Sequence, residues 1–103
     1  MQKLTKQEIA VCYGYSKKKG GNLKRCKVNE LLIYPNNSFV HENAKWLKYW
    51  ELRQQGHKVL TECWAGEERC DLVDLTNDER WEFETDTNRA ARFSGRPVNV
   101  VMV

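Results

Sequence analysis

Residues 39–85 constrain the fold most, because a long helical pattern is followed there by three short strand patterns. The spacing of the apolar side chains predicts an amphipathic helix over residues 39–55, with Ser38 as its N-cap and Gly56 just beyond its end. We expect the apolar stripe of this helix to pack on the sheet. The stripe consists of Phe39, Val40, Ala44, Leu47 and Trp50, and Trp46 lies at its edge.

Three strand patterns follow this helix, over residues 57–63, 69–75 and 80–85. Turn-forming residues separate them at 64–68 and 76–79, and links this short indicate antiparallel neighbours. The three strands are therefore expected to form an antiparallel meander.

The end of the chain predicts a crossover to a parallel strand. Asp86, Thr87 and Asn88 are typical of a helix cap, and the helix is expected to extend to about Phe93. Residues 98–103 are apolar on both faces, which indicates a buried strand parallel to the one before the helix. The expected fold is α/β, with a four- to five-stranded mixed sheet flanked by helices.

The chain has 103 residues, of which 41% are hydrophobic, and this is enough for one domain. Its apolar runs are all much shorter than the ~20 residues of a membrane span, and its N-terminus is too polar for a secretory signal. We therefore expect a single cytoplasmic domain over residues 1–103 that does not bind a membrane.

Charge is distributed unevenly along the chain. Residues 1–41 carry eight Lys and Arg against two Glu, whereas residues 42–103 carry nine against twelve Asp and Glu. A basic surface beside an acidic cluster suits a metal-dependent enzyme that acts on a polyanion. Ordinary solvated charge is the alternative, and charge alone favours it.

Residues 1–38 form a basic leader that we expect to pack on the rest of the domain, the core over residues 39–103. A capping-box pattern favours a short helix from Thr5 toward Tyr15. The apolar run at 9–13 would also suit a strand, so both alternatives stay open.

The four cysteines, Cys12, Cys26, Cys63 and Cys70, leave three chemical states open. No CxxC pair occurs, so the strong signature of a zinc site is missing. Cys63 and Cys70 could face each other across a hairpin, whereas Cys12 and Cys26 bracket a basic loop. Reduced thiols are favoured over disulfides, and disulfides over zinc.

Acidic residues gather on the second and third strand patterns. Alternation along residues 80–85 places Glu82 and Glu84 on the same side of the strand, and Asp71 on the neighbouring strand can lie beside either. Three carboxylates that converge on one face repel each other, and a divalent cation relieves the repulsion. Oxygen ligands without suitably spaced His or Cys indicate Mg²⁺ or Mn²⁺. A solvated sheet face is the alternative.

A family resemblance rests on three segments in order: HENAKWLKYWELRQQGHKVLTE, then RCDLVDL, then WEFET. Through them, residues 39–103 resemble the PD-(D/E)xK nuclease superfamily, and in particular its archaeal Holliday-junction-resolvase-like branch. The resemblance implies a restriction-endonuclease-like αβββαβ core and hydrolysis of DNA phosphodiester bonds. It also implies that Glu42, Asp71 and Glu82 bind metal.

The family pattern has a Lys two residues after the Glu of the third strand, and Glu84 stands there in this chain. In the mechanism that we expect, Asp71 and Glu82 hold one Mg²⁺ or Mn²⁺ with help from the carbonyl of Phe83. The ion lowers the pKa of a bound water and offsets charge on the scissile phosphate. Glu84 takes the proton of that water or holds a second ion, and Glu42 completes the outer shell.

Basic side chains beside these acids are the candidates for binding DNA. They are Lys17, Lys18, Lys19, Lys24 and Arg25 in the leader, and Arg89 and Arg92 after the third strand. No sequence-reading motif is present, so contacts to the DNA backbone are expected. His41 and His57, at the two ends of the long helix, have no partner pattern for nucleophilic catalysis and are expected to have surface roles.

The predicted function is therefore a Mg²⁺- or Mn²⁺-dependent endonuclease that acts on branched or double-stranded DNA, with a homodimer suggested by family analogy. Two other functions stay open. One is a nuclease-fold protein that binds DNA without cutting it, because Glu84 replaces the Lys. The other is a small interaction protein in which the cysteines bind zinc or form disulfides.

Overall fold

The structure, a computed structural model, describes residues 4–15, 28–66, 68–93, 95 and 97–103. Its helices are α1 (Lys6–Tyr15), α2 (Phe39–Gln54), α3 (Thr87–Ala90) and the 3₁₀ turn η1 (Ala91–Phe93). Its strands are β1 (Val59–Ala65), β2 (Glu68–Asp74), β3 (Glu79–Glu84) and β4 (Val98–Met102). None of the helices in these ranges is both long and apolar enough to cross a membrane.

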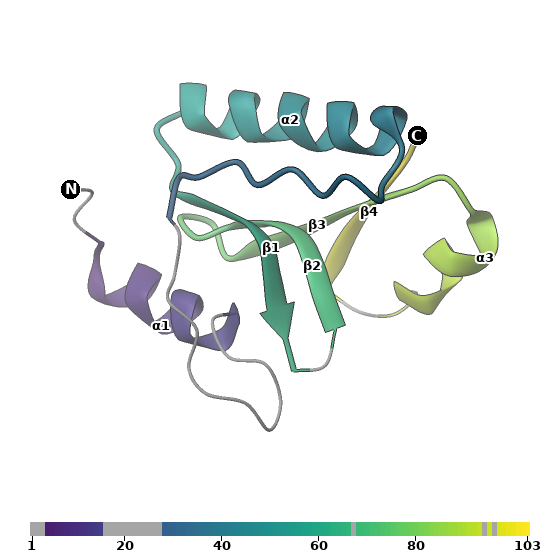
Figure 1. Ribbon diagram of the computed structural model, residues 1–103. Helices are drawn as coiled ribbons and strands as arrows, with labels where there is room; N and C mark the ends of the chain where they lie inside the picture. Colours follow the sequence, from purple (N-terminus) through teal and green to yellow (C-terminus); the bar gives the residue numbers. More distant parts are fainter. Residues whose placement is uncertain (1–3, 16–27, 67, 94, 96) are drawn as a thin grey trace.

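The four strands form one mixed sheet in the order β1-β2-β3-β4. The first three are antiparallel neighbours, and β4 runs parallel to β3. The crossover between β3 and β4 passes through α3 and η1 at one end of the sheet (Figure 1). The α/β class, the meander and the parallel last strand are therefore confirmed.

Side-chain caps fix where the helices begin. The Ser38 hydroxyl accepts a hydrogen bond from the His41 amide at 3.1 Å, and the Asp86 carboxylate accepts one from the Asn88 amide at 2.9 Å. In α1, the Thr5 amide donates to Glu8 at 2.8 Å and the Glu8 amide donates to the Thr5 hydroxyl at 3.1 Å. This reciprocal capping box explains why residues 6–15 form a helix rather than a strand.

Each face of the sheet has its own apolar cluster. On the α1 side the cluster contains Cys12, Leu60, Cys63, Cys70, Val73 and Leu75. On the α2 side it contains Leu52, Val59, Leu72 and Phe83. Helices on opposite faces therefore bury two small cores rather than one (Figure 1).

The segment that precedes α2 runs along the outer edge of β1. The Asn29 amide donates to the Val59 carbonyl at 2.8 Å, and the Leu32 amide donates to the Thr61 hydroxyl at 2.9 Å. The Thr61 hydroxyl in turn donates to the Glu30 carbonyl at 2.8 Å. These bonds cover part of an edge that would otherwise be open for pairing.

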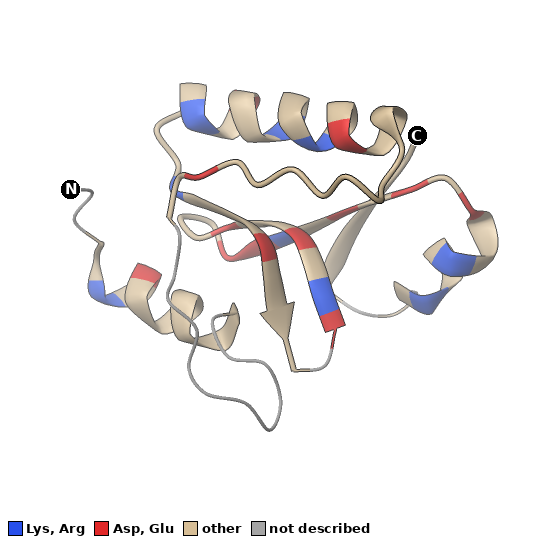
Figure 2. Ribbon diagram, in the orientation of Figure 1, with Lys and Arg blue, Asp and Glu red and all other residues tan. Residues whose placement is uncertain are grey.

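The prediction that the apolar stripe of α2 packs on the sheet is wrong for every member except Ala44, which packs against the cluster on the α2 side. Phe39, Val40, Trp46, Leu47 and Trp50 are all exposed, and the side chains that α2 buries are those of Glu42, Lys45 and Leu52. Figure 2 shows the charged residues of α2 mainly on the side toward the sheet. The helix is rotated so that its polar side chains reach the acidic residues of β1 and β2, and those contacts determine its orientation.

The cysteines divide between two states. Cys63 and Cys70 are buried free thiols and are direct cross-strand partners of β1 and β2, as their spacing suggested. Cys12 is disulfide-bonded, so the preference for reduced thiols is wrong for this cysteine, and Cys26 lies outside the described residues. A hydrogen bond with Cys70, followed by burial, raises the pKa of the Cys63 thiol, which keeps it protonated.

Glu8 joins α1 to the sheet, and we expect Glu8→Gln to destabilise the protein by about 1–2 kcal/mol at pH 7. Hydrogen bonds from the Thr5 amide, Lys58 and Thr76 outweigh burial and lower the pKa of Glu8 from 4.5 to about 2. The contribution is therefore complete above about pH 4.5 and is lost as the pH falls toward 2. Urea unfolding of parent and variant between pH 7 and 3 should show the difference shrinking, and a constant difference would contradict this assignment.

Candidate functional site

The side-chain alternation of β1 and β2 reverses at two facing residues, Glu62 and Asp71. Val73 belongs to the cluster on the α1 side and Leu72 to the one on the α2 side, yet Cys70 is again on the α1 side. Glu62 has φ = +50°, a left-handed conformation that is uncommon for a residue with a Cβ. As a result the Glu62 and Asp71 side chains both turn toward α2.

Beside Asp71, hydrogen bonds to side-chain carboxylates replace the backbone pairing between β2 and β3. The paired residues of the two strands extend from Asp74–Glu79 to Leu72–Trp81. Beyond them, the Phe83 amide donates to Asp71 Oδ2 at 2.9 Å, and the Asp71 amide donates to Glu82 Oε2 at 3.3 Å. Each strand thus offers a carboxylate to an amide of the other, which brings both acids together between the strands.

Asp71 and Glu82 meet from different sides of the sheet. Phe83 packs on the α2 side, so Glu82 and Glu84, which alternate with it, point to the other side. Asp71 reaches the same place from the α2 side, because the alternation of β2 has reversed there. The acids therefore converge as expected, but through the gap between two strands rather than on one face.

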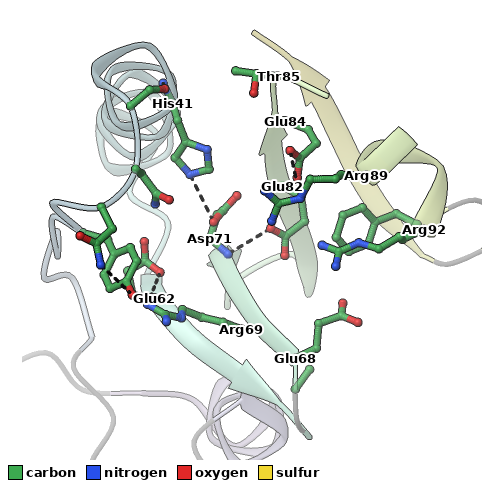
Figure 3. A pocket seen from close by; sticks show the side chains of 16 residues that line it. His41, Glu62, Glu68, Arg69, Asp71, Glu82, Glu84, Thr85, Arg89 and Arg92 are labelled. Atoms are coloured by element: carbon green, nitrogen blue, oxygen red, sulfur yellow. Dashed lines mark hydrogen bonds and ion pairs between the residues drawn. The ribbon is translucent and has the colours of Figure 1, made fainter. Parts of the chain in front are cut away.

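A pocket of about 780 Å³ opens at this point. Its acidic lining residues are Glu62, Glu68, Asp71, Glu82 and Glu84. Its basic lining residues are His41, Arg69, Arg89 and Arg92. Figure 3 shows these side chains pointing inward from α2, from β1 to β3 and from the α3–η1 crossover. Acidic and basic side chains therefore alternate around a single open pocket.

His41 comes from the first turn of α2 and points at Asp71 (Figure 3). Its Nε2 atom lies 3.4 Å from Asp71 Oδ1, and this contact raises the pKa of the imidazole. Burial tends to raise the pKa of Asp71, but the contacts with His41, Glu82 and the Phe83 amide outweigh it and lower that pKa. Asp71 is therefore ionised at neutral pH. The expectation of a surface role is wrong for His41. It is also wrong for His57, whose Nδ1 lies 2.8 Å from the carboxylate of the buried Asp74.

Glu82 is the buried acid of the pair. Burial, followed by the charge of Asp71, raises the pKa of Glu82 to about 9. Arg80 opposes this effect, since its Nε donates to Glu82 Oε1 at 2.9 Å, and the same guanidinium also pairs with Glu68. The two acids together with Arg80 form a compact hydrogen-bonded group at the base of the pocket.

Glu84 lies at the outer end of the pocket beside cations. Its Oε1 atom is 3.8 Å from Arg89 Nε, and the guanidinium of Arg92 lies 5.4 Å from the Phe93 ring. Arg69 stands over the Tyr34 ring at 4.1 Å on the opposite wall. The guanidinium groups of Arg89 and Arg92 therefore lie on one side of the acids, and that of Arg69 lies on the other.

Glu42 is turned away from Asp71 and Glu82. Its Oε1 atom accepts a hydrogen bond from the Tyr34 amide at 2.8 Å, and its Oε2 atom pairs with Lys45 Nζ at 2.6 Å. Lys45 is fully buried, and its ammonium also reaches Glu62 at 2.9 Å and the Leu32 carbonyl at 2.7 Å. Glu42 therefore belongs to a buried charge cluster behind the pocket and is not among its lining residues.

Sequence reasoning placed Asp71, Glu82, Glu84, Arg89 and Arg92 in one site, and the structure brings these five side chains to one pocket. It assigned no role at the site to His41, Glu62 or Arg69, which line the pocket, or to Lys45 and Arg80, which pair with its acids. The spacing of Glu42 and Lys45 is the i,i+3 spacing of a helical ion pair, which could have indicated that contact. Phe83 contributes its amide to Asp71, and its ring is buried. The leader residues Lys17, Lys18, Lys19, Lys24 and Arg25 lie outside the described residues.

The oxygen atoms at the site suit a hard cation better than zinc. In the described ranges, no group of three or more His, Cys, Asp or Glu side chains is arranged to hold a metal ion. Mg²⁺, however, is usually bound through one or two carboxylates, with water and substrate phosphate completing its shell. Asp71 is an ionised carboxylate at the base of an open pocket, and the adjacent Glu82 would become its second oxygen ligand by releasing a proton when the ion binds, so their chemistry fits such an ion.

Comparisons with known proteins returned no relative. No protein-family model, curated protein or solved structure matches the chain.

Proposed function

We propose that this chain is a small DNA endonuclease that depends on Mg²⁺ or Mn²⁺, with the charged pocket as its active site. The observation that carries the proposal is the meeting of Asp71 and Glu82 between two strands, at the base of a pocket flanked by Arg69, Arg89 and Arg92. Adjacent acids that face cations across an open pocket suit a phosphodiester substrate, which brings negative charge to the site.

The order of elements supports the assignment to a restriction-endonuclease-like core. A helix, three antiparallel strands, a crossover helix and a parallel strand follow one another from α2 to β4. Asp71 on the second of these strands and Glu82 on the third are the acids that the resemblance implies. Family analogy also suggests branched DNA of the Holliday-junction kind as a substrate.

Asp71 and Glu82 would hold the ion. When bound, the ion would neutralise charge on the scissile phosphate and lower the pKa of a water molecule. His41 orients the Asp71 carboxylate, because its ring nitrogen lies beside Oδ1 while the Phe83 amide holds Oδ2. Glu82 is held by hydrogen bonds from Arg80 and from the Asp71 amide, one to each of its carboxylate oxygens.

Glu84 and the arginines would act on the substrate. Glu84 stands two residues beyond Glu82 on the same side of β3 and accepts the proton of the attacking water. Arg89 and Arg92 bind phosphate groups next to the cut, and Arg69 binds the strand on the opposite wall. Release of Arg89 from Glu84 accompanies binding, because their contact is long and exposed.

A cleavage assay tests the proposal. The full chain is incubated with a labelled four-way junction, a linear duplex and a single strand, with Mg²⁺, Mn²⁺ or a chelator. We expect metal-dependent nicking, with the junction cut fastest. Absence of nicking on all three substrates in both metals would refute an endonuclease.

One observation favours a second function, DNA binding without cutting. Glu84 replaces the usual Lys and lies beside Arg89, and Arg80 already occupies one oxygen of Glu82. The same samples distinguish the two functions, because a non-cutting protein would shift the junction in a gel at low salt and leave it intact.

The guanidinium groups of the crossover provide a further prediction. Replacing Arg89 and Arg92 together by Ala should reduce the slope of log Kd against log salt for duplex DNA by about 2, since each phosphate contact contributes about 0.9. Arg53→Ala is the control, because Arg53 lies at the other end of α2 and binds the His57 carbonyl. Fluorescence anisotropy at several salt concentrations gives the slopes, and equal slopes for the parent and the double variant would remove these arginines from the interface.

A further inference from the structure

The outward face of α2 is apolar and contains no charged side chain. At 100° per residue, one sector of about 120° collects seven residues of the helix. They are Phe39, Val40, Asn43, Trp46, Leu47, Trp50 and Gln54. The nearest charged positions, Glu51 and Arg53, stand at the two borders of this sector. We call these seven residues the outer face of α2.

The apolar side chains of the outer face are well exposed, and two of them stack on each other. Five of them, from Phe39 to Trp50, keep between 43% and 81% of their surface exposed. The rings of Trp46 and Trp50 are stacked at a centroid distance of 6.0 Å. An exposed apolar patch of several hundred Å² on a chain this small is typical of an interaction surface.

Absence of charge restricts what can cover this face. DNA and anionic lipid surfaces are bound through Lys and Arg, and the outer face offers none. An identical face is a suitable partner, because neither copy would bury an unpaired charge. Two copies related by a twofold axis can also place their helices antiparallel, and this aligns the helix dipoles favourably.

The area of the outer face is sufficient for a dimer. With about 150–250 Å² for each whole aromatic side chain, the five exposed side chains present on the order of 500–600 Å² to solvent. A symmetric pair would bury about 1,000–1,200 Å² in total, which reaches the lower limit of specific interfaces. We propose that the chain forms a symmetric dimer through the outer faces of two α2 helices.

The dimer would place its two pockets at opposite ends of the interface. Ser38 and His41, at the N-terminal end of α2, line the pocket. In an antiparallel pair the two N-terminal ends are separated by about the length of the helix, on the order of 24 Å for 16 residues. The proposal does not depend on what the pockets do, and its test measures mass rather than cleavage.

Sedimentation equilibrium of the full chain at about 100 μM tests the dimer, since interfaces of this size give roughly micromolar constants. We expect twice the monomer mass of 12.2 kDa for the parent. Leu47→Lys and Trp50→Lys should each raise the dissociation constant at least ~100-fold, because they bury like charges near the twofold axis. Both positions are exposed, so the monomer keeps its fold, which circular dichroism checks.

Ile9→Lys is the matched control. Ile9 is 42% exposed on α1, which lies on the opposite face of the sheet, so this variant should remain a dimer. A monomeric parent at 100 μM would overturn the proposal, whether or not the protein then binds vesicles or another apolar partner. Dimers that persist in both α2 variants would overturn it as well, because a different surface would form them.

Discussion

Lys45→Met is expected to destabilise the protein by about 3–5 kcal/mol, the largest change in stability that we predict for a single substitution. Lys45 is fully buried, and its ammonium bridges Glu42 at 2.6 Å and Glu62 at 2.9 Å. Removing it leaves the carboxylates of Glu42 and Glu62 close together beneath α2, without the cation that pairs with both. Urea unfolding at pH 7 measures the change.

Two further variants make this prediction specific. Lys48→Met, one turn away, should cost about 1 kcal/mol or less, because Lys48 pairs with an exposed Glu51 at 3.3 Å. Adding Glu62→Gln to Lys45→Met should recover part of the loss, since the remaining repulsion disappears. Equal costs for Lys45→Met and Lys48→Met would mean that the buried cluster does not hold α2 on the sheet.

Asp71→Asn is expected to reduce DNA cleavage by about 10³-fold or more, which corresponds to about 4 kcal/mol at the transition state. The amide oxygen of Asn can still accept the hydrogen bond from Phe83, which Asp71 now receives at 2.9 Å, so the fold should persist. What is lost is the negative charge that a divalent ion requires. Initial rates of junction nicking in Mg²⁺ measure the effect.

Asp78→Asn is the matched control for this variant. Asp78 is exposed in the turn between β2 and β3 and has φ = +54°, a conformation that Asn tolerates well. The control should cut at the rate of the parent. Similar rates for Asp71→Asn and the parent would remove Asp71 from the reaction.

Much of the fold could be predicted because it depends on local patterns. Ser38 and Gly56 bracket α2 as expected, and short turns produce the meander. The parallel strand at Val98–Met102 followed from its mostly apolar sequence. The prediction that this strand is buried is wrong, because β4 lies at the edge of the sheet and none of its residues is buried. Strand bounds were shifted by one or two residues, since pairing partners rather than composition decide where a ladder ends.

The orientation of α2 could not be predicted, because the usual rule fails there. An apolar stripe normally faces the core, but in this helix Lys45 and Glu42 do so. Their burial depends on Glu62 and Leu32, which are distant in sequence and reach the helix only in the folded chain. The contradiction between local pattern and packing is the reason why we propose the outer face of α2 as an interface.

The site itself was predictable in part. Alternation identified Glu82 and Glu84, and strand adjacency brought Asp71 to them. The reversal of β1 and β2 at Glu62 carries no sequence signal, because a left-handed conformation is usually indicated by Gly or Asn. Because the reversal could not be predicted, the contact between His41 and Asp71 could not be predicted either.

Calorimetric titration of the full chain with Mn²⁺ is the most direct test of the central claim, that Asp71 and Glu82 form a divalent-cation site. The parent and Asp78→Asn should bind Mn²⁺ with equal affinity. Asp71→Asn should bind at least ~10-fold more weakly, because it loses the carboxylate that is ionised before the metal ion binds. Binding of equal strength by Asp71→Asn, or no binding by the parent, would contradict the claim.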